Sequence, residues 1–258
     1  MKILVSAFFV LAYTLSVYAS SEDALTIEDF DRFKIGTINT SGWYVRDRSN
    51  SIDDVYSIER EGDNQFLHAD NEGQFVQIFK KGGWSIKHRP YLSWKWRVIK
   101  HPEGANPINK KNDCAAGIYV VFKKSLFSVR SIKYVWVPEG EPEHLIRTRY
   151  DYPQITIRVN KDNLGKWITE ERNVAEDYEK LWGKKPGNVV AIGIITEADS
   201  VKVKKAIADY DDFLALKEPT GHKTPLAPVK KPEQENKKKD ADTNKPLAFY
   251  IPSDQIDS

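Results

Sequence analysis

Apolar and polar side chains alternate along much of the chain between residues 20 and 216. In the run 92–98, Leu-Ser-Trp-Lys-Trp-Arg-Val, every second residue is apolar. This period of two is typical of a strand with one buried and one solvent-facing side. The runs at 132–136 and 155–159 repeat it. Continuous apolar runs at 117–122 and 189–195 predict central strands that are covered on both faces.

Shorter runs predict further strands at 43–46, 55–58, 65–69, 75–79 and 207–216, separated by turn sequences at 61–64, 81–83 and 102–104. One segment has helical spacing instead. Asn173 is a suitable N-cap, Glu176 completes a capping-box pair, and Gly183 stands at the C-terminal end. About ten strands and one short surface helix, 173–182, predict an all-β fold, a two-sheet jelly-roll-like β-sandwich.

The N-terminus has the pattern of a cleavable secretory leader. Lys2 is followed by an almost wholly apolar run, 3–15, which is too short to cross a bilayer, and small or branched residues precede Ala19. We expect cleavage after Ala19, export to the periplasm or the medium, and no stable membrane span afterwards. An uncleaved anchor is the alternative.

Composition divides the rest of the chain into two parts. Residues 20–216 carry the strand pattern and form the predicted β-sandwich domain. From residue 217 to 258 the chain is rich in Lys, Pro and Glu, and such a segment buries too little apolar surface to order itself. We expect a disordered tail. Its short apolar end, 246–252, is either a docking peptide or a loose terminus.

Charge and cysteine content exclude several classes of function. The 39 Lys and Arg nearly cancel the 37 Asp and Glu, so a nucleic-acid partner is not expected. Cys114 is the single cysteine and lies in an apolar run, which predicts a buried structural thiol rather than a nucleophile. Neither a C-x-x-C pair nor a histidine-rich pattern is present, and this argues against a structural zinc site.

Seven patches of sequence look familiar as a set: Pro90–Val98, Asn112–Phe122, Lys133–Trp136, Trp167–Val174, Asp177–Tyr178, Ala191–Thr196 and Ala208–Phe213. Together they resemble the bacterial exported family called domain of unknown function 3047, over residues 28–216. The order of elements is also similar to that of galactose-binding-like jelly rolls. The resemblance implies an exported protein and this architecture, but no activity. Gly117 and the loop 197–200 depart from the pattern expected of relatives.

Two pairs of neighbouring acids invite a glycosidase interpretation. Two-carboxylate hydrolysis needs side chains that face each other across the scissile bond. Glu170 and Glu171 are neighbours on an extended segment and point to opposite faces, and so do Asp211 and Asp212. A structural ion pair of Glu171 or Arg172 beside the helix start is the favoured role. Neither a nucleophile-elbow motif nor a phosphate loop is present.

The strongest candidates for ligand contacts are polar and aromatic residues of the predicted strands. Lys95 and Arg97 lie on the polar side of run 92–98, and Tyr134 and Trp136 are expected nearby in the sheet, where they would line a concave face. Asp113 completes this candidate site.

No cofactor and no metal site are predicted. The acids that would suit a hard cation are Asp113, Glu197, Asp199 and Asp209. Because they lack calcium-loop spacing, a solvated acidic loop is favoured, and a structural calcium ion is the alternative.

These observations favour a non-enzymatic binding module for a glycan or another component of the cell envelope, with an envelope protein as the other partner class. A polysaccharide-active enzyme that uses carboxylates from separate strands is one alternative. A structural or assembly protein that docks through its C-terminal tail is another.

Overall fold

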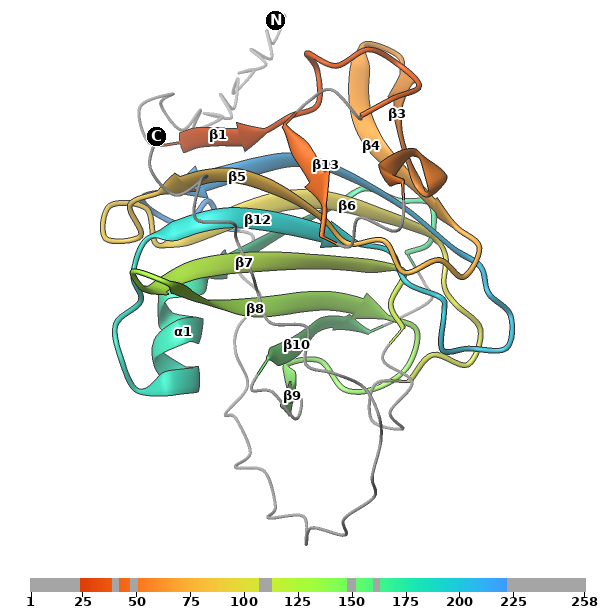
Figure 1. Cartoon of the computed structure of the whole chain (residues 1–258). Coiled ribbons are helices and arrows are strands. Elements are labelled where there is room, and N and C mark those ends of the chain that lie inside the picture. The colour runs from red at the N-terminus through yellow and green to blue at the C-terminus, as the bar shows by residue number, and fades with distance from the viewer. Residues whose placement is uncertain are drawn as a thin grey trace, which may run out of the picture.

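The computed structural model describes residues 24–38, 42–46, 51–106, 113–147, 152–159 and 163–221. The predicted leader and nearly all of the predicted tail lie outside these residues. The described chain is mostly strand, with one α-helix and one short 3-10 turn (Figure 1). In chain order the elements are β1 Ala24–Glu28, β2 Trp43–Val45, η1 Ile52–Asp54, β3 Tyr56–Glu61, β4 Asn64–Asn71, β5 Ile78–Trp84, β6 Tyr91–Lys100, β7 Ala116–Ser125, β8 Ser128–Val137, β9 His144–Arg147, β10 Pro153–Val159, β11 Ile168–Asn173, α1 Val174–Trp182, β12 Val189–Ile195 and β13 Ala206–Leu216.

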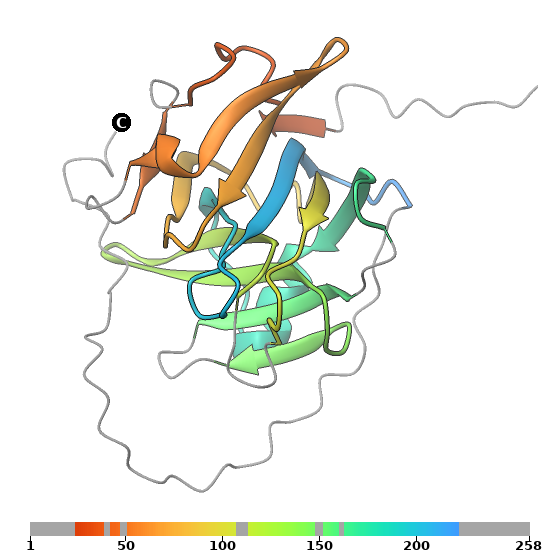
Figure 2. The same cartoon turned by 90° about the vertical axis from the view of Figure 1, so that its right-hand side faces the viewer.

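The strands form two sheets that stack on each other (Figure 2). Sheet A has six strands in the order β11-β6-β13-β4-β3, with β1 also paired to β13. Sheet B has seven strands in the order β2-β5-β12-β7-β8-β10-β9. Neighbours are antiparallel except β10 and β8, which run parallel. The predicted jelly-roll-like β-sandwich is therefore confirmed, with β1, β9 and β11 as strands that the sequence pattern did not mark.

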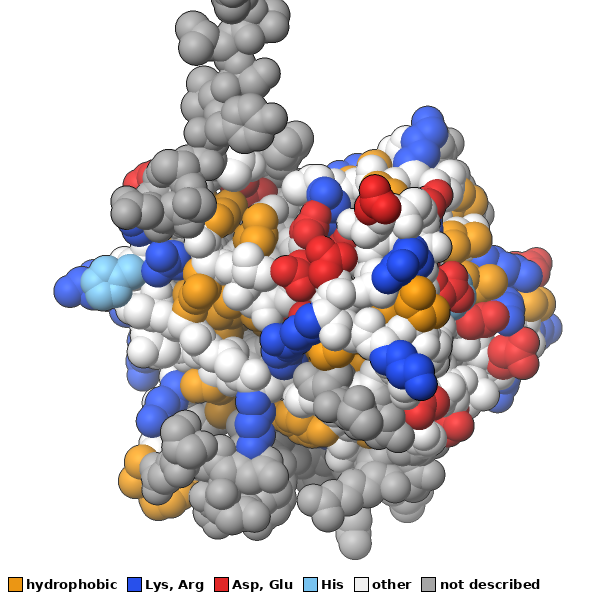
Figure 3. Space-filling view, turned by 90° about the horizontal axis from the view of Figure 1, so that it is seen from above, with side chains coloured by type: hydrophobic (Ala, Val, Ile, Leu, Met, Phe, Trp, Pro, Cys, Tyr) orange, Lys and Arg blue, Asp and Glu red, His pale blue; other side chains and the backbone are white. Residues whose placement is uncertain are grey.

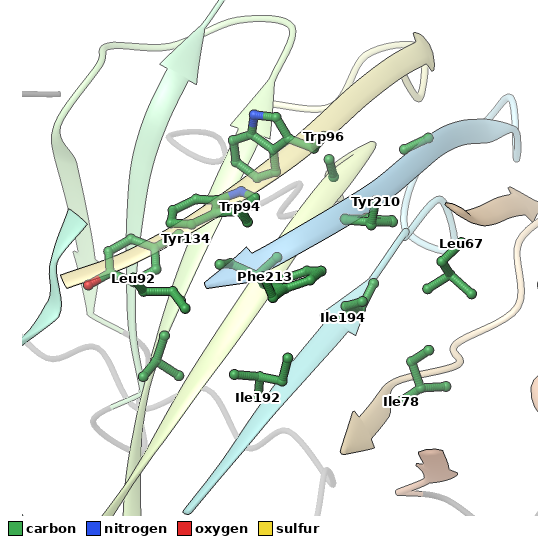
Figure 4. Close-up of a cluster of buried hydrophobic side chains, with 14 of the residues drawn as sticks. Leu67, Ile78, Leu92, Trp94, Trp96, Tyr134, Ile192, Ile194, Tyr210 and Phe213 are labelled. Carbon is green, nitrogen blue, oxygen red and sulfur yellow. The ribbon is translucent and has the colours of Figure 1, made fainter. Parts of the chain in front are cut away.

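The main core lies between the sheets and is rich in aromatic side chains (Figure 4). The apolar side of β6 supplies Trp94 and Trp96, both with no exposed surface. From sheet B, Tyr134 stacks on Trp94 with ring centroids 6.0 Å apart, and Trp136 lies 5.8 Å from Trp96. Full burial of one such ring stabilises the fold by roughly 1.5–3 kcal/mol, so this contact holds the two sheets together.

Helix α1 has the predicted ends. The Asn173 side chain accepts a hydrogen bond from the backbone N–H of Glu176 at 3.1 Å. Gly183 ends the helix with a φ of 64°, a left-handed conformation that glycine adopts without steric cost. Tyr178 and Leu181 belong to the main core, so the helix packs its apolar face against one end of the sandwich.

One predicted turn is wrong. Residues 81–83 lie inside β5, and the predicted strand at 75–79 begins only at Ile78. The glycines serve a close approach rather than a turn. A Cβ on Gly83 would lie 2.0 Å from the carbonyl oxygen of Val189 on the neighbouring strand β12. Only glycine fits this contact.

A buried ion-pair network joins β11, α1 and β8. The Arg172 guanidinium donates to the carboxylates of Glu143, at 2.7 and 3.1 Å, and of Asp177, at 3.2 Å. The hydroxyl of Tyr134 donates to Asp177 at 2.7 Å. The Arg172 side chain is 1% exposed. The favoured structural role of Arg172 beside the helix start is thus confirmed.

A second buried carboxylate sits where β13 is irregular. The pairing of β13 with β6 shifts register between Asp211 and Leu214, and Asp212 has a φ of 48°. Asp211 accepts hydrogen bonds from Asn64 Nδ2 at 2.9 Å and from the Asp212 N–H at 2.8 Å. Burial nevertheless raises the pKa of Asp211 to about 7. The folded chain therefore holds this proton more tightly than the unfolded chain does.

We expect Arg172→Met to lower the free energy of unfolding by about 3–5 kcal/mol, because it leaves two buried carboxylates without a cation. Lys180→Met is the matched control. Lys180 forms an exposed i,i+4 pair with Glu176 on the same helix, so its loss costs less than about 1 kcal/mol. Urea denaturation measures both. A loss below about 1 kcal/mol for Arg172→Met would contradict a stabilising role for the network.

The raised pKa of Asp211 also predicts a pH dependence. Its stabilisation is fully present below the unfolded pKa and is lost as pH rises through about 7. Asp211→Asn removes this titration. The stability of the variant minus that of the wild type should therefore increase between pH 4 and pH 8, on the order of 2 kcal/mol. Urea titrations across this range test it, and a difference that is flat or falls with pH refutes it.

Candidate functional site

The structure does not bring the four strand residues predicted as a ligand face together. Lys95 and Arg97 lie on the outer face of sheet A. Tyr134 and Trp136 point inward from β8 of sheet B and have no exposed surface. The expectation of one shared face fails because the two aromatic rings pack against the tryptophans of β6, on the side of that strand opposite to Lys95 and Arg97.

The Arg97 side chain contacts two carboxylates and two aromatic rings on the outer face of sheet A. Its Nε donates to Asp209 at 2.6 Å and its Nη1 to Glu61 at 2.8 Å. The guanidinium also lies over the rings of Phe66 and Trp167, with centroid distances of 5.2 and 4.6 Å. These contacts use Arg97 to hold the sheet surface together. Its neighbour Lys95 pairs with Asp212 at 2.6 Å and is half-exposed.

Three of the four acids predicted as cation ligands do meet. Ligand oxygens of Asp113, Glu197 and Asp199 lie within 4.8 Å of one another at one end of sheet B. The fourth, Asp209, is fully buried on sheet A, where it binds Arg97 and His68. Such a carboxylate triad suits a hard cation or the hydroxyl groups of a polar ligand.

The triad already has internal partners. Lys133 Nζ donates to Glu197 at 3.0 Å, and the N–H of Ser200 donates to Asp113 at 3.0 Å. Burial raises the pKa of Glu197 and of Asp199, and the neighbouring carboxylates act in the same direction. Lys133 offsets this repulsion only in part, so the triad keeps an excess of negative charge. Asp199 Oδ1 is buried and has no hydrogen-bond partner.

Lys133 belongs to a row of residues that crosses sheet B from strand to strand. Direct pairs join β2, β5, β12, β7, β8 and β10, so these side chains share the outer face, turned away from sheet A. We call them the sheet B row: Tyr44, Phe79, Gly193, Tyr119, Lys133 and Gln154.

A glycine makes the aromatic half of the row continuous. The rings of Phe79 and Tyr119 come from strands on either side of β12 and have centroids 5.6 Å apart. A Cβ on Gly193 would lie 2.4 Å from the Phe79 ring. Tyr44 extends the stack, with its ring centroid 6.2 Å from that of Phe79. Lys133 Nζ lies 5.8 Å from the centroid of the Tyr119 ring.

Exposure and hydrogen bonding differ along the row. Tyr44 is 37% exposed, whereas the remaining side chains are buried, with Gln154 at 5%. Hydrogen bonds support Tyr119 in the middle of the row. Gln77 donates to the Tyr119 hydroxyl at 2.8 Å, and Arg46 donates to Gln77 at 3.2 Å. Gln154 points away from the main core, because its neighbour Ile155 points into it. The Nε2 of Gln154 has no hydrogen-bond partner.

The other candidate residues, Glu170, Glu171 and Cys114, have structural surroundings in the described chain. Glu170 points inward and accepts from Trp96 and Arg158, whereas Glu171 accepts from Thr220 on the outer side, so they point to opposite faces as predicted. Cys114 is buried, and burial raises the pKa of its thiol to about 12, as expected of a structural cysteine. Within the described ranges, helix α1 is too short to cross a membrane.

Sequence reasoning missed most of the row. Tyr44, Phe79 and Gln154 lie far apart in the sequence, and only strand register makes them neighbours. Tyr119, Lys133 and Gly193 were noted only as parts of familiar patches, whereas Asp113 of the neighbouring triad was among the predicted residues. A usable signal was the break in the apolar run 189–195 at Gly193, because a glycine inside a strand often marks a close approach of side chains or backbone.

Comparison with solved structures finds several sugar-active proteins at low similarity. The carbohydrate-binding module TmCBM61, solved with β-1,4-galactotriose, is 11% identical, with a TM-score of 0.36 over 76% of this chain and 99% of that one. A Cel12A cellulase derived from Rhodothermus marinus is 10% identical, with a TM-score of 0.37 over 74% and 97%. The family 11 xylanase from Neocallimastix patriciarum is 10% identical, with a TM-score of 0.30 over 75% and 95%.

No curated protein is similar enough to this chain to count as a match. A family model does match, over residues 41–214, which is most of the β-sandwich and includes the sheet B row and the carboxylate triad. The chain therefore belongs to the family described as "Protein of unknown function (DUF3047)".

Proposed function

We propose that this protein is an exported, non-enzymatic module that binds a neutral glycan along the outer face of sheet B. One observation carries the proposal. The sheet B row combines an exposed aromatic ring, Tyr44, with an unpartnered amide donor, Gln154, and it adjoins a carboxylate triad with an unpartnered acceptor, Asp199.

The chemistry of the row matches that of a sugar. The C–H faces of a pyranose pack on aromatic rings, and Tyr44 offers such a ring, which is tilted by 33° against that of Phe79. Sugar hydroxyls both donate and accept hydrogen bonds. Gln154 Nε2 can donate to one hydroxyl and Asp199 Oδ1 can accept from another, and both atoms lack a partner within the protein. A ligand that supplies those bonds removes the cost of leaving them unmade.

The charges of the site favour an uncharged ligand. Arg46, Lys81 and Lys133 lie on or beside the row, and Lys81 Nζ is 6.0 Å from the centroid of the Tyr44 ring. Together with the three carboxylates of the triad, they place charges of both signs along the site. An ionic sugar would therefore gain no net attraction, whereas neutral hydroxyls can bond to both kinds of group.

The length of the row favours an oligomer. Tyr44 and Gln154 lie on strands that are five steps apart in sheet B. At about 4.8 Å per step the row is about 24 Å long, which exceeds a single sugar ring. A chain that starts on the exposed ring of Tyr44 and extends toward the triad would follow the line of the row.

Binding is favoured over hydrolysis by the state of the buried acids. Glu170 is paired with Arg158, and Glu143 is paired with Arg172. In both pairs the arginine occupies carboxylate oxygens that a glycosidase would need to point at the substrate. Export rests on the leader sequence at residues 1–19. The alternative of docking through the tail concerns residues outside the described chain.

Tyr44→Ala should weaken binding of a neutral oligosaccharide by about tenfold or more, because one stacked ring contributes on the order of 1–2 kcal/mol. A glycan array with the wild type selects the ligand, and calorimetry compares the variants. Lys95→Ala, on the outer face of sheet A, is the control and should bind like the wild type. Equal loss in both variants, or binding that Tyr44→Ala leaves unchanged, would refute the placement.

Gln154→Leu separates a ligand role from a structural one. The change removes an unpartnered buried donor, so it should leave the melting temperature unchanged or raise it while it weakens glycan binding. Calorimetry and thermal unfolding on the same preparation measure both effects. Full binding in Gln154→Leu would confine the ligand to the Tyr44 end and overturn the proposal that it spans the row. A large drop in melting temperature would assign Gln154 a structural role instead.

A further inference from the structure

The turn of the hairpin between β7 and β8 consists of two large apolar residues that are exposed. Phe127 is 84% exposed and Leu126 is 62% exposed, the highest values among the large hydrophobic residues of the described chain. Most of the surface of both residues therefore lies in water rather than in the fold. Single exposed apolar residues are ordinary, but two adjacent ones at the tip of a projecting hairpin are a marker of an interaction site.

The geometry of the turn does not require these residue types. The strands pair up to Ser125 and Ser128, whose hydroxyls lie 2.6 Å apart, so Leu126 and Phe127 form a two-residue connection. Gly, Asn and Asp are favoured where such a connection has a positive φ, and neither Leu126 nor Phe127 has one, so the turn itself makes no demand on these side chains. Large apolar residues at both positions therefore serve something other than the folding of the hairpin.

Cations surround this tip. The loop between α1 and β12 packs against the base of the hairpin, where the N–H of Lys123 donates to the carbonyl of Asn188 at 2.9 Å. Gly187 permits the contact, because a Cβ there would lie 2.3 Å from the Lys123 carbonyl oxygen. The loop between β5 and β6 ends at the same edge of the sandwich, on the left in Figure 1. We call the exposed lysines of the hairpin and the two loops the basic end: Lys87, Lys123, Lys124, Lys184 and Lys185.

The three connections that form the basic end contain no acids. No Asp or Glu occurs in residues 73–102, 114–138 or 180–196, which contain these three connections. Figure 3, seen from above, shows Lys and Arg side chains along the same left-hand edge. The carboxylate triad lies at the far ends of β7 and β12, at the opposite edge of the sandwich. Lysines also occur at that opposite edge, but they are mixed with acids, since Lys205 pairs with Asp70 and Glu72. The two edges therefore differ in charge although the formal net charge of the chain is only +2.

We propose that the basic end docks on the surface of an anionic phospholipid bilayer, with Leu126 and Phe127 inserted at the headgroup level. Lysines attract an anionic leaflet, and apolar side chains at their centre enter the boundary between headgroups and acyl chains. A soluble polyanion would use the lysines but would leave Phe127 and Leu126 in water, so the exposed pair favours the bilayer. Docking at this edge leaves the outer face of sheet B free, and the proposal does not depend on a glycan.

Vesicle flotation tests the proposal with the chain from Ser20 onward, which contains every described residue and lacks the apolar leader. The probes are vesicles of phosphatidylcholine alone and vesicles with about one third phosphatidylglycerol. The wild type should float with the anionic vesicles only, and less in high salt because exposed charges are screened. Leu126→Ser/Phe127→Ser should weaken this partitioning by about tenfold or more, because two apolar side chains no longer leave water.

Val203→Ser is the matched control, an exposed apolar residue in the loop between β12 and β13 at the opposite edge, and it should float like the wild type. Melting temperatures of both variants should equal that of the wild type, since the altered side chains are exposed. Equal flotation of the double variant, or equal flotation with neutral vesicles, overturns the proposal. So does binding to heparin that matches binding to anionic vesicles and survives the double substitution, because that result indicates recognition of a soluble polyanion.

Discussion

The packing of β6 against β8 is the contact on which the rest of the structure depends. Trp94 and Trp96 must leave water, and the facing rings of Tyr134 and Trp136 in sheet B pack against them. Because strand side chains alternate, this choice fixes every other residue on both strands. It turns Lys95 and Arg97 to one outer surface of the sandwich and Lys133 to the other.

The outer faces of the two sheets differ in the contacts that their polar side chains make. On sheet A, Arg97 is closed within its own ion pairs and aromatic neighbours. Buried atoms without a hydrogen-bond partner occur on both sheets, since Glu171 of sheet A and Gln154 of sheet B each keep one. On sheet B, Gln154 shares its row with the exposed ring of Tyr44, and the row adjoins the triad, where Asp199 keeps another. Unmade hydrogen bonds of buried groups cost free energy, and a fold retains them where a ligand completes them. The combination of unmatched polar atoms with an exposed aromatic ring is why we place binding on sheet B.

The sequence predicted what depends on local pattern and missed what depends on register. Alternation along 92–98 identified the strand and its buried side, and Asn173 and Gly183 identified the helix ends. The acids Asp113, Glu197 and Asp199 were grouped correctly by their chemistry, although Asp209 was not, because neighbouring strands place it on the other sheet. Tyr134 and Trp136 were assigned to a ligand face since an alternating strand does not reveal which side meets the second sheet. Tyr44, Phe79 and Gln154 become one row only through five strand pairings.

The central claim, that the sheet B row is a ligand site, is tested most directly by mapping amide chemical shifts while neutral oligosaccharides are added to the labelled protein. The account predicts that perturbed amides cluster on β2, β5, β7, β8 and β10, with the largest changes around Tyr44 and Gln154. Perturbations that cluster on β4, β6 and β13 around Arg97 would contradict it, and so would the absence of perturbations with every oligosaccharide in a broad panel.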